Sequence, residues 1–167
     1  MKKLVLSVLV ENHSGVLSRV AGLFSRRGYN IDSLSVGVTT NPDVSRMTIV
    51  ARGDDQILEQ IKKQLNKLVD VIKIIELPND KSVYRELALI KVESTAQTRP
   101  SIIEIADIFR AKIIDVATEA LTIEITGDQN KLSAFIDLLN PFGIKEIVRT
   151  GLTGIKRGNE DIKKYLD

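Results

Sequence analysis

Residues 8–17 read VLVENHSGVL, and the fold is decided there because a strand pattern changes into a helix pattern. Val8 and Val10 continue an alternation of apolar residues that begins at Leu4 and Leu6, as is typical of a half-buried strand. The next apolar residues recur at helical spacing and form one stripe: Leu17, Val20, Ala21 and Phe24. Gly28 then ends the predicted helix. The polar residues ENHSG therefore form a loop that leads into a helix N-terminus.

The two patterns alternate again further along the chain. After the first strand and helix, strands are predicted at residues 31–38 and 44–51, a helix from Asp54, and a strand at 71–77. This βαββαβ order is the ferredoxin-like arrangement. The same order recurs between residues 87 and 148, after the polar break PNDKS at residues 78–82. The sequence thus predicts an α+β protein of two tandem ferredoxin-like domains, 1–78 and 83–158, followed by a tail at 159–167.

Composition and charge exclude several classes of function. The formal net charge is +2, from 24 basic and 22 acidic residues, so binding to nucleic acid through bulk charge is not indicated. The chain has no cysteine, and His13 is its only histidine. We therefore expect no metal site, no bound cofactor and no catalytic residues. No stretch approaches the roughly 18 apolar residues of a membrane span, which predicts a cytoplasmic chain with no membrane partner.

The predicted strand at residues 31–38 lies at a sheet edge in a ferredoxin-like domain. From Ser33 to Thr40 it has no charged residue and no proline. Sheet edges are usually protected by such residues, because an unprotected edge pairs with other chains. The sequence therefore predicts that this strand pairs with the same strand of a second copy, giving a homodimer.

Asn12, Gly15 and Asn30 allow two interpretations. They could be structural, with Asn12 and Ser14 capping the helix, Gly15 in a tight turn and Asn30 as a turn residue. They could instead form a site in which helix N–H groups bind a carboxylate. Amide oxygens would then bind an ammonium group, beside apolar residues that accept a side chain. Such a site suits a free amino acid, with its apolar neighbours being Val16, Leu17 and Ile31.

Six segments resemble the small regulatory subunit of acetolactate synthase, also called acetohydroxyacid synthase. They are VENHSGVLSRV (10–20), GLFSRRGYNI (22–31), SRMTI (45–49), EQI (59–61), QLNKLVDV (64–71) and FRAKIIDV (109–116). Together they extend over nearly the whole chain. The resemblance implies that the first domain is an ACT domain, the amino-acid-sensing module of many biosynthetic enzymes.

The resemblance also implies a function and partners. The chain would be a non-catalytic partner of a large subunit that holds thiamine diphosphate, Mg and FAD. It would activate that subunit in branched-chain amino acid biosynthesis and confer feedback inhibition by valine or another branched-chain product. The ligand would lie between two copies, in contact with these residues: Asn12, Ser14, Gly15, Val16 and Leu17 of one chain, and Asn30 and Ile31 of the other.

Two other functions stay open at this point. The chain could be an ACT-type binding module that serves a different client enzyme, or an enzyme in its own right. The lack of convergent titratable residues disfavours the enzyme. The equivalent loop of the second domain, residues 93–100, has no Asn-x-Ser-Gly pattern, so we expect it not to bind valine in the same way.

Overall fold

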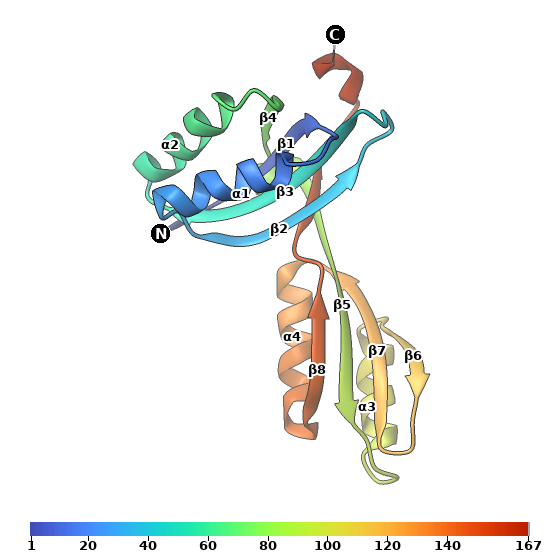
Figure 1. The fold of residues 1–167 in the computed structure, drawn as a ribbon. Coiled ribbons are helices and arrows are strands. Elements are labelled where there is room, and N and C mark those ends of the chain that lie inside the picture. Colours follow the sequence, from blue (N-terminus) through green and yellow to red (C-terminus); the bar gives the residue numbers. More distant parts are fainter. Residues whose placement is uncertain (167) are drawn as a thin grey trace. The chain divides into compact units, whose positions relative to one another are not determined.

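The computed structural model describes residues 1–166, which form two compact units (Figure 1). One unit consists of Met1–Val83 and the segment that begins at Leu152, and the other of Tyr84–Gly151. Each unit has a four-stranded antiparallel sheet and two helices in the order βαββαβ. The predicted α+β class and its two ferredoxin-like repeats are therefore confirmed.

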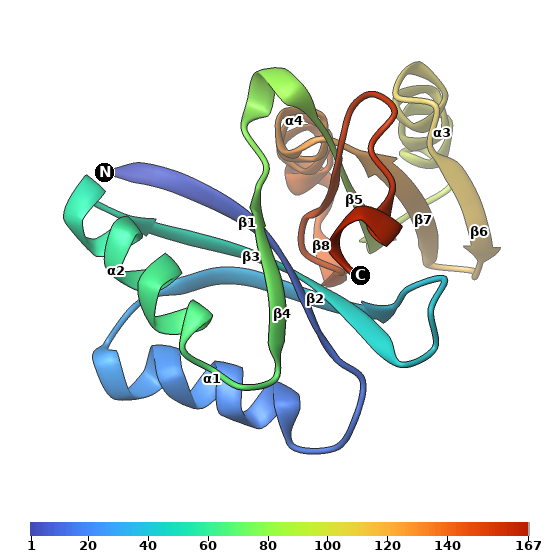
Figure 2. The same ribbon diagram turned by 90° about the horizontal axis from the view of Figure 1, so that it is seen from above.

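The first unit has its strands in the order β2-β3-β1-β4. Its elements are β1 (Lys2–Glu11), α1 (Val16–Arg27), β2 (Ile31–Val38), β3 (Val44–Gly53), α2 (Asp55–Asn66) and β4 (Val71–Glu76). Both helices lie on one face of the sheet (Figure 2). β2 is an edge strand, as predicted, and Val36 and Val38 on it are 48% and 62% exposed.

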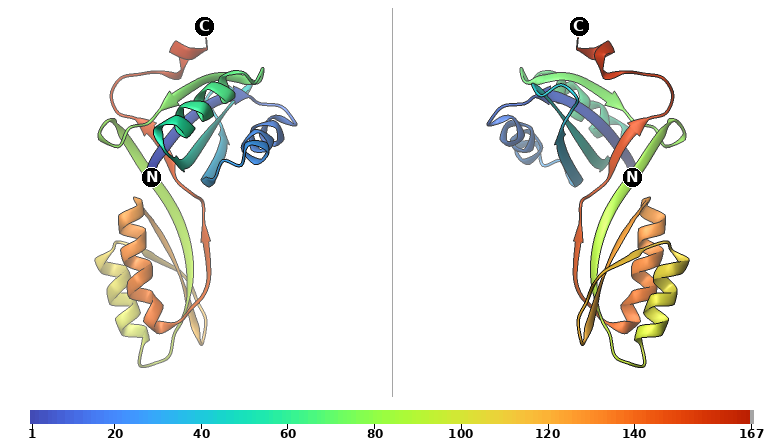
Figure 3. Two further views of the ribbon diagram at one scale, coloured as in Figure 1. Left: turned by 90° about the vertical axis from the view of Figure 1, so that its left-hand side faces the viewer. Right: turned by 90° about the vertical axis from the view of Figure 1, so that its right-hand side faces the viewer.

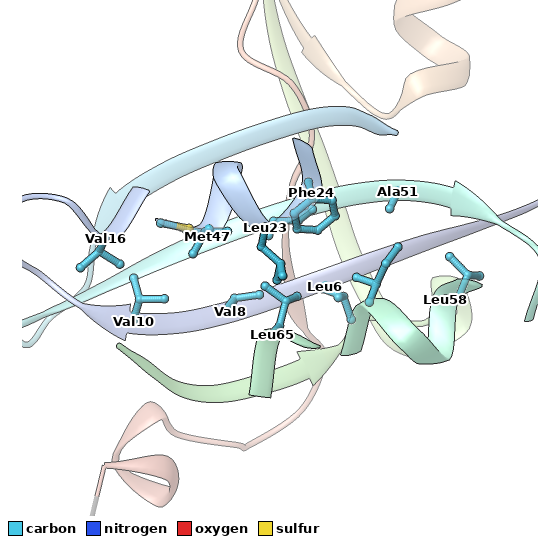
Figure 4. Close-up of a cluster of buried hydrophobic side chains, with 13 residues drawn as sticks. Leu6, Val8, Val10, Val16, Leu23, Phe24, Met47, Ala51, Leu58 and Leu65 are labelled. Atoms are coloured by element: carbon cyan, nitrogen blue, oxygen red, sulfur yellow. The ribbon is translucent and has the colours of Figure 1, made fainter. Parts of the chain in front are cut away.

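The core of the first unit lies between that face and the two helices (Figure 4). Alternate residues of β1 project into it, namely Leu6, Val8 and Val10. α1 contributes a stripe that starts one residue earlier than predicted: Val16, Val20, Leu23 and Phe24. Leu17 is 47% exposed, so its predicted place in the apolar stripe is wrong. Since helical side chains lean toward the N-terminus, Val16 reaches the core and Leu17 faces outward.

The second unit repeats this architecture with the strand order β6-β7-β5-β8. Its elements are β5 (Ser82–Glu93), α3 (Arg99–Ile108), β6 (Lys112–Val116), β7 (Ala120–Gly127), α4 (Gln129–Leu139) and β8 (Ile144–Arg149). α3 and α4 cover one face of its sheet (Figure 3). Phe109 and Phe135 pack there with ring centroids 5.2 Å apart. Among residues 1–166, no helix is both long and apolar enough to span a bilayer.

The C-terminal segment, residues 152–166, belongs to the first unit, whereas the sequence analysis assigned residues 152–158 to the second domain. The segment contains β9 (Thr153–Lys156) and a short 3₁₀ helix, η3 (Ile162–Tyr165). Leu152 is buried, and its carbonyl accepts a hydrogen bond from Ser35 Oγ at 3.2 Å. β9 pairs with β5, whose first two residues are also in this unit. The segment lies on the sheet face opposite α1 and α2 (Figures 2 and 3).

Candidate functional site

The loop before α1 ends in a left-handed backbone conformation that glycine adopts readily and other residues do not. Gly15 is the N-cap residue with φ +89°, and no side chain caps the helix. The interpretation of Asn12 and Ser14 as caps is therefore wrong, while that of Gly15 as a tight-turn residue is confirmed. An added Cβ at Gly15 would lie 2.9 Å from Arg19 Nη1, so a side chain here would be both strained and crowded.

The first turn of α1 consequently has free donors. Among the hydrogen bonds of residues 1–166, none uses the backbone N–H of Val16, Leu17 or Ser18 as donor, and the first one at this end runs from Arg19 N to Gly15 O at 3.0 Å. The first turn contains no acidic residue. Free N–H groups and the helix dipole together favour an anion at this position.

Asn12 fixes the other side of the loop. Its side-chain Nδ2 donates to the carbonyl of Pro42 at 2.8 Å, and its backbone N–H donates to the carbonyl of Asp43 at 2.8 Å. Both acceptors lie in the turn between β2 and β3. The two bonds leave the side-chain oxygen of Asn12 without a hydrogen bond within the described chain, so it is available to a ligand's donor.

Four charged side chains lie beside the loop, and the sequence analysis missed three of them. Arg19 Nε donates to Asp70 Oδ2 at 2.5 Å, and Asp70 is buried. His13 Nε2 lies 3.0 Å from Glu11 Oε2 and 3.3 Å from Asp70 Oδ1. Arg19 could have been found from sequence, because it follows Gly15 by one helical turn. Asp70 could not, because it is 51 residues from Arg19.

These contacts change the protonation of His13 and Asp70. The hydrogen bond to Glu11 and then that to the Ser14 carbonyl raise the pKa of His13 above its ordinary value. The hydrogen bond from Arg19 lowers the pKa of Asp70. Asp70 therefore stays ionised at neutral pH. His13 stays protonated, and so paired with the carboxylates, up to a higher pH than an ordinary histidine would.

Within residues 1–166, three of these side chains together could hold a metal ion. Ligand atoms of Glu11, His13 and Asp70 lie within 4.8 Å of one another. The sequence analysis expected no such cluster from a single histidine. Arg19 already occupies one oxygen of Asp70, and its positive charge would repel a divalent cation. The group is therefore better described as an ion-pair network that holds the loop.

Asn30 and Ile31 lie at the other end of α1. Asn30 is exposed, and its Nδ2 donates to Asp32 Oδ1 at 3.1 Å. α1 has 12 residues, so its two ends are about 18 Å apart. One chain therefore does not bring the predicted residues of the loop and of β2 to the same small ligand. They could meet only across two copies of the chain.

The antiparallel βαββαβ unit, with an uncapped helix behind a glycine turn, defines the class of the first unit. Residues 6–73 match the family model described as the AHAS small subunit-like ACT domain, where AHAS stands for acetohydroxyacid synthase. Residues 85–158 match the model of the small subunit of acetolactate synthase. The first unit is therefore an ACT domain, and the second is the C-terminal domain that accompanies it in this family.

Relatives and a solved structure agree over almost the whole chain. The chain is 54% identical to the probable acetolactate synthase small subunit of Archaeoglobus fulgidus, over 95% of this chain and 99% of that one. It is 58% identical to the acetolactate synthase small subunit of Mycolicibacterium smegmatis, over 94% and 92%. The crystal structure of the Thermotoga maritima small subunit matches with a TM-score of 0.89 at 44% identity, covering 96% of this chain and all of that one. The chain belongs to the family of acetolactate synthase small subunits.

Proposed function

We propose that this chain activates the catalytic large subunit of acetolactate synthase and makes it sensitive to feedback inhibition by valine. The chain would contribute no catalytic residue and no cofactor, while thiamine diphosphate, Mg and FAD would belong to the large subunit. In this proposal residues 1–78 form the sensing domain, with the segment from Leu152 packed on it, and the second domain is the part of residues 83–158 that precedes this segment. Family membership supports the partnership, and the uncapped N-terminus of α1 behind Gly15 is the observation that carries the sensing role.

The proposed valine site is shared between two ACT domains. The carboxylate of valine binds the free N–H groups of Val16 and Leu17, and its ammonium group binds the side-chain oxygen of Asn12. Gly15 leaves room for the carboxylate, and Ser14 lines the same loop. Leu17, which is half-exposed in the single chain, contacts the isopropyl group. If a ligand and a partner chain bury Leu17, its apolar side chain is no longer exposed to water, which explains an apolar residue at this position.

The register of the sheet supports the contribution of a second copy. Val38 of β2 and Val10 of β1 both pair with Ser45 of β3, so the C-terminal end of β2 lies on the same side of the sheet as the loop. Antiparallel pairing of two β2 strands, centred between Leu34 and Ser35, would place Ile31 of a second copy opposite Val38. Asn30 and Ile31 of that copy would then approach the loop from the free edge.

Regulation follows from linkage between two equilibria: the binding of valine and the binding of the large subunit. If valine favours one arrangement of the ACT pair and the large subunit favours another, each ligand weakens the binding of the other. Coupling of this kind is typically about 1–3 kcal/mol, which changes affinity by roughly 5- to 150-fold. Inhibition then needs no contact between valine and the catalytic centre.

Reconstitution with a purified large subunit tests this function. We expect the large subunit to form acetolactate from pyruvate faster when the chain is added, and valine to reverse that gain. The chain alone should form no product, and the large subunit alone should be much less sensitive to valine. An unchanged rate on adding the chain, or equal valine sensitivity without it, would contradict the proposal.

A further inference from the structure

The ACT domain has a second candidate site, on the sheet face opposite α1 and α2. A cavity of about 1120 Å³ lies there between β2, β3 and the C-terminal segment. Its lining includes Ser35 and Gly37 of β2, Arg46 and Thr48 of β3, and Lys156 and Lys163 of the segment. All of these residues belong to the first unit. Its volume lies slightly above the range of about 300–1,000 Å³ that is typical of small-molecule sites in proteins, and it opens to solvent.

Arg46 lines this cavity, and its positive charge has no negatively charged partner among the described residues. It is half-buried, and within residues 1–166 no carboxylate lies in ion-pair distance of it and no hydrogen bond engages its guanidinium group. Burial lowers the pKa of Arg46 from its ordinary value, and the nearby Tyr165 hydroxyl group only partly opposes that effect. Leaving a half-buried guanidinium group without an acceptor is costly, since charged groups away from water are normally paired.

The negative charge in the segment is already engaged by other groups. Glu160 accepts a hydrogen bond from Tyr165 at 2.9 Å and lies 3.9 Å from Lys156 Nζ and 3.6 Å from Lys164 Nζ. Asp161 accepts a hydrogen bond from the backbone N–H of Lys163 at 2.9 Å. Neither carboxylate forms an ion pair with Arg46 in the described chain. The guanidinium group is therefore free to bind an external anion.

Two neighbouring positions describe this face: Gly37 borders open space, and Ser7 is a buried polar residue. Gly37 pairs directly with Arg46, and a Cβ added to Gly37 would meet nothing within 4 Å. Ser7, which pairs with Thr48 on the same face, is fully buried, and its Oγ has no hydrogen-bond partner among the described residues. Buried hydroxyl groups are normally satisfied. An unpaired hydroxyl and an unpaired guanidinium group thus lie on adjacent rows of one face.

We propose that this cavity binds a small molecule that has an anionic head, either a carboxylate or a phosphate, and an apolar body. The head binds the Arg46 guanidinium group, whose planar fork matches both kinds of oxyanion. The body lies along the apolar side chains of the lining, which include Ile75, Leu77 and Ile155. The site is separate from the proposed valine site, because it lies on the other face of the sheet and uses none of its residues.

NMR titration of the full chain with three probes tests this site. The probes are inorganic phosphate, hexanoate and hexylamine, the last having the same chain length as hexanoate and the opposite charge. We expect phosphate or hexanoate to shift the amide signals of Ser35, Thr48 and Gly154 in a saturable manner, and hexylamine not to do so. The head group that saturates at the lower concentration identifies the class of ligand.

Two variants make the test specific. R46Q removes the charge and the guanidinium fork while keeping a polar side chain, and should weaken binding of the anionic probe by roughly tenfold or more. R52Q is the matched control, because Arg52 is on the same strand and face, pairs with Asp32 and does not line the cavity. R52Q should leave the affinity for the probe unchanged, and R46Q should bind valine like the parent chain.

Three outcomes would overturn the proposal. In one, no anionic probe saturates. In another, hexylamine binds as well as hexanoate, so that charge is not recognised. In the third, R46Q changes the self-association of the chain while the affinity for the probe is unaltered, which would assign the cavity to contact with a second copy.

Discussion

The loop before α1 and the loop before α3 hold the same place in two units of the same fold, but they treat the helix N-terminus differently. In the first unit a left-handed glycine leaves the helix uncapped. In the second, Thr95 N donates to Thr98 Oγ1 at 2.8 Å and Thr98 N donates to Thr95 Oγ1 at 3.1 Å. Pro100, in the first turn of α3, has no N–H to offer. Thr98 makes no side-chain capping bond to α3 either, but the N–H of Arg99 donates to the carbonyl of Thr95, so the second loop leaves fewer donors for a ligand than the first.

The two loops are also tied down differently. Asn12 holds the carbonyl of Pro42 through a neutral bond, and the Arg19–Asp70 ion pair lies beside the loop. Arg99 instead donates from Nη2 to the carbonyls of Ala117 and Thr118, at 2.9 and 3.2 Å, and from Nε to Ser94 Oγ at 3.1 Å. Arg99 thus links the loop before α3 to the turn between β6 and β7, and these bonds stabilise the second unit. Under the proposed function, one fold would serve as sensor in the first unit and as scaffold in the second through a few residues in a single loop.

The largest expected effect comes from a charge on the edge strand of the sensing unit. V36K places a lysine on β2, where we propose that two ACT domains pair. We expect loss of the dimer, measured by light scattering, and valine binding weakened by about 100-fold or more, because half of each site comes from the partner.

V116K is the matched control on β6, the corresponding edge strand of the second unit, where Val116 is 62% exposed. It should leave both dimer and valine affinity unchanged. A V36K monomer that still binds valine with parental affinity would remove the distinction between the two units.

A methyl group at Gly15 should have the next largest effect. G15A places a Cβ at φ +89°, 2.9 Å from Arg19 Nη1, and should cost about 1–2 kcal/mol of stability through backbone strain. We also expect valine affinity to fall roughly tenfold, as measured by calorimetry, because the methyl group narrows the carboxylate site.

G143A controls for strain, because Gly143 in the second unit has φ +98°. It should lose similar stability and keep its valine affinity. If G15A and G143A weaken valine binding equally, the effect is general destabilisation and the loop is not the site.

The sequence predicted much of this architecture and less of the site. Periodicity identified every strand and helix of both repeats, because each element has one apolar face. It also identified β2 as an unprotected edge from its lack of charge. It misplaced Leu17, since a stripe read by spacing alone can begin one residue early or late.

Contacts between distant residues were beyond sequence reasoning. No local pattern joins Asp70 to Arg19, or Leu152 to Ser35, and both contacts depend on strand order. Capping by Asn12 and Ser14 was equally plausible in sequence, because those residues favour caps. The structure decides against it through the bond of Asn12 to Pro42 and the left-handed Gly15.

A smaller effect is expected from opening the second loop. R99Q removes the bonds that tie the loop to the turn between β6 and β7, and should lower the free energy of unfolding by about 1–3 kcal/mol. Urea denaturation measures this change. Valine affinity should stay at the parental value, so a loss of valine binding in R99Q would show that the second loop also takes part in sensing.

The smallest expected effect is on pH dependence. The raised pKa of His13 means that its ion-pair contact is complete below pH 6.5 and is lost as pH rises through the higher pKa of the folded chain. Asp70, with its lowered pKa, stays ionised throughout.

Since the protonated network holds the loop in place, valine affinity should fall by about twofold to threefold from pH 6 to 8.5. H13Q should bind valine with an affinity that is flat over this range, as measured by calorimetry. A parental pH dependence in H13Q would assign the effect to another group.

Mixing two defective variants tests the shared valine site most directly. G15D removes the carboxylate site of its own loop, and N30A removes the amide that we propose each chain lends to its partner. Each variant alone should bind valine poorly, while N30A should still activate the large subunit. After the two are mixed and allowed to exchange subunits, each mixed dimer holds one intact site. We predict recovery of about a quarter of the parental binding capacity, the share expected for random pairing in a two-fold dimer. No recovery, despite proven subunit exchange, would contradict a site built from two chains.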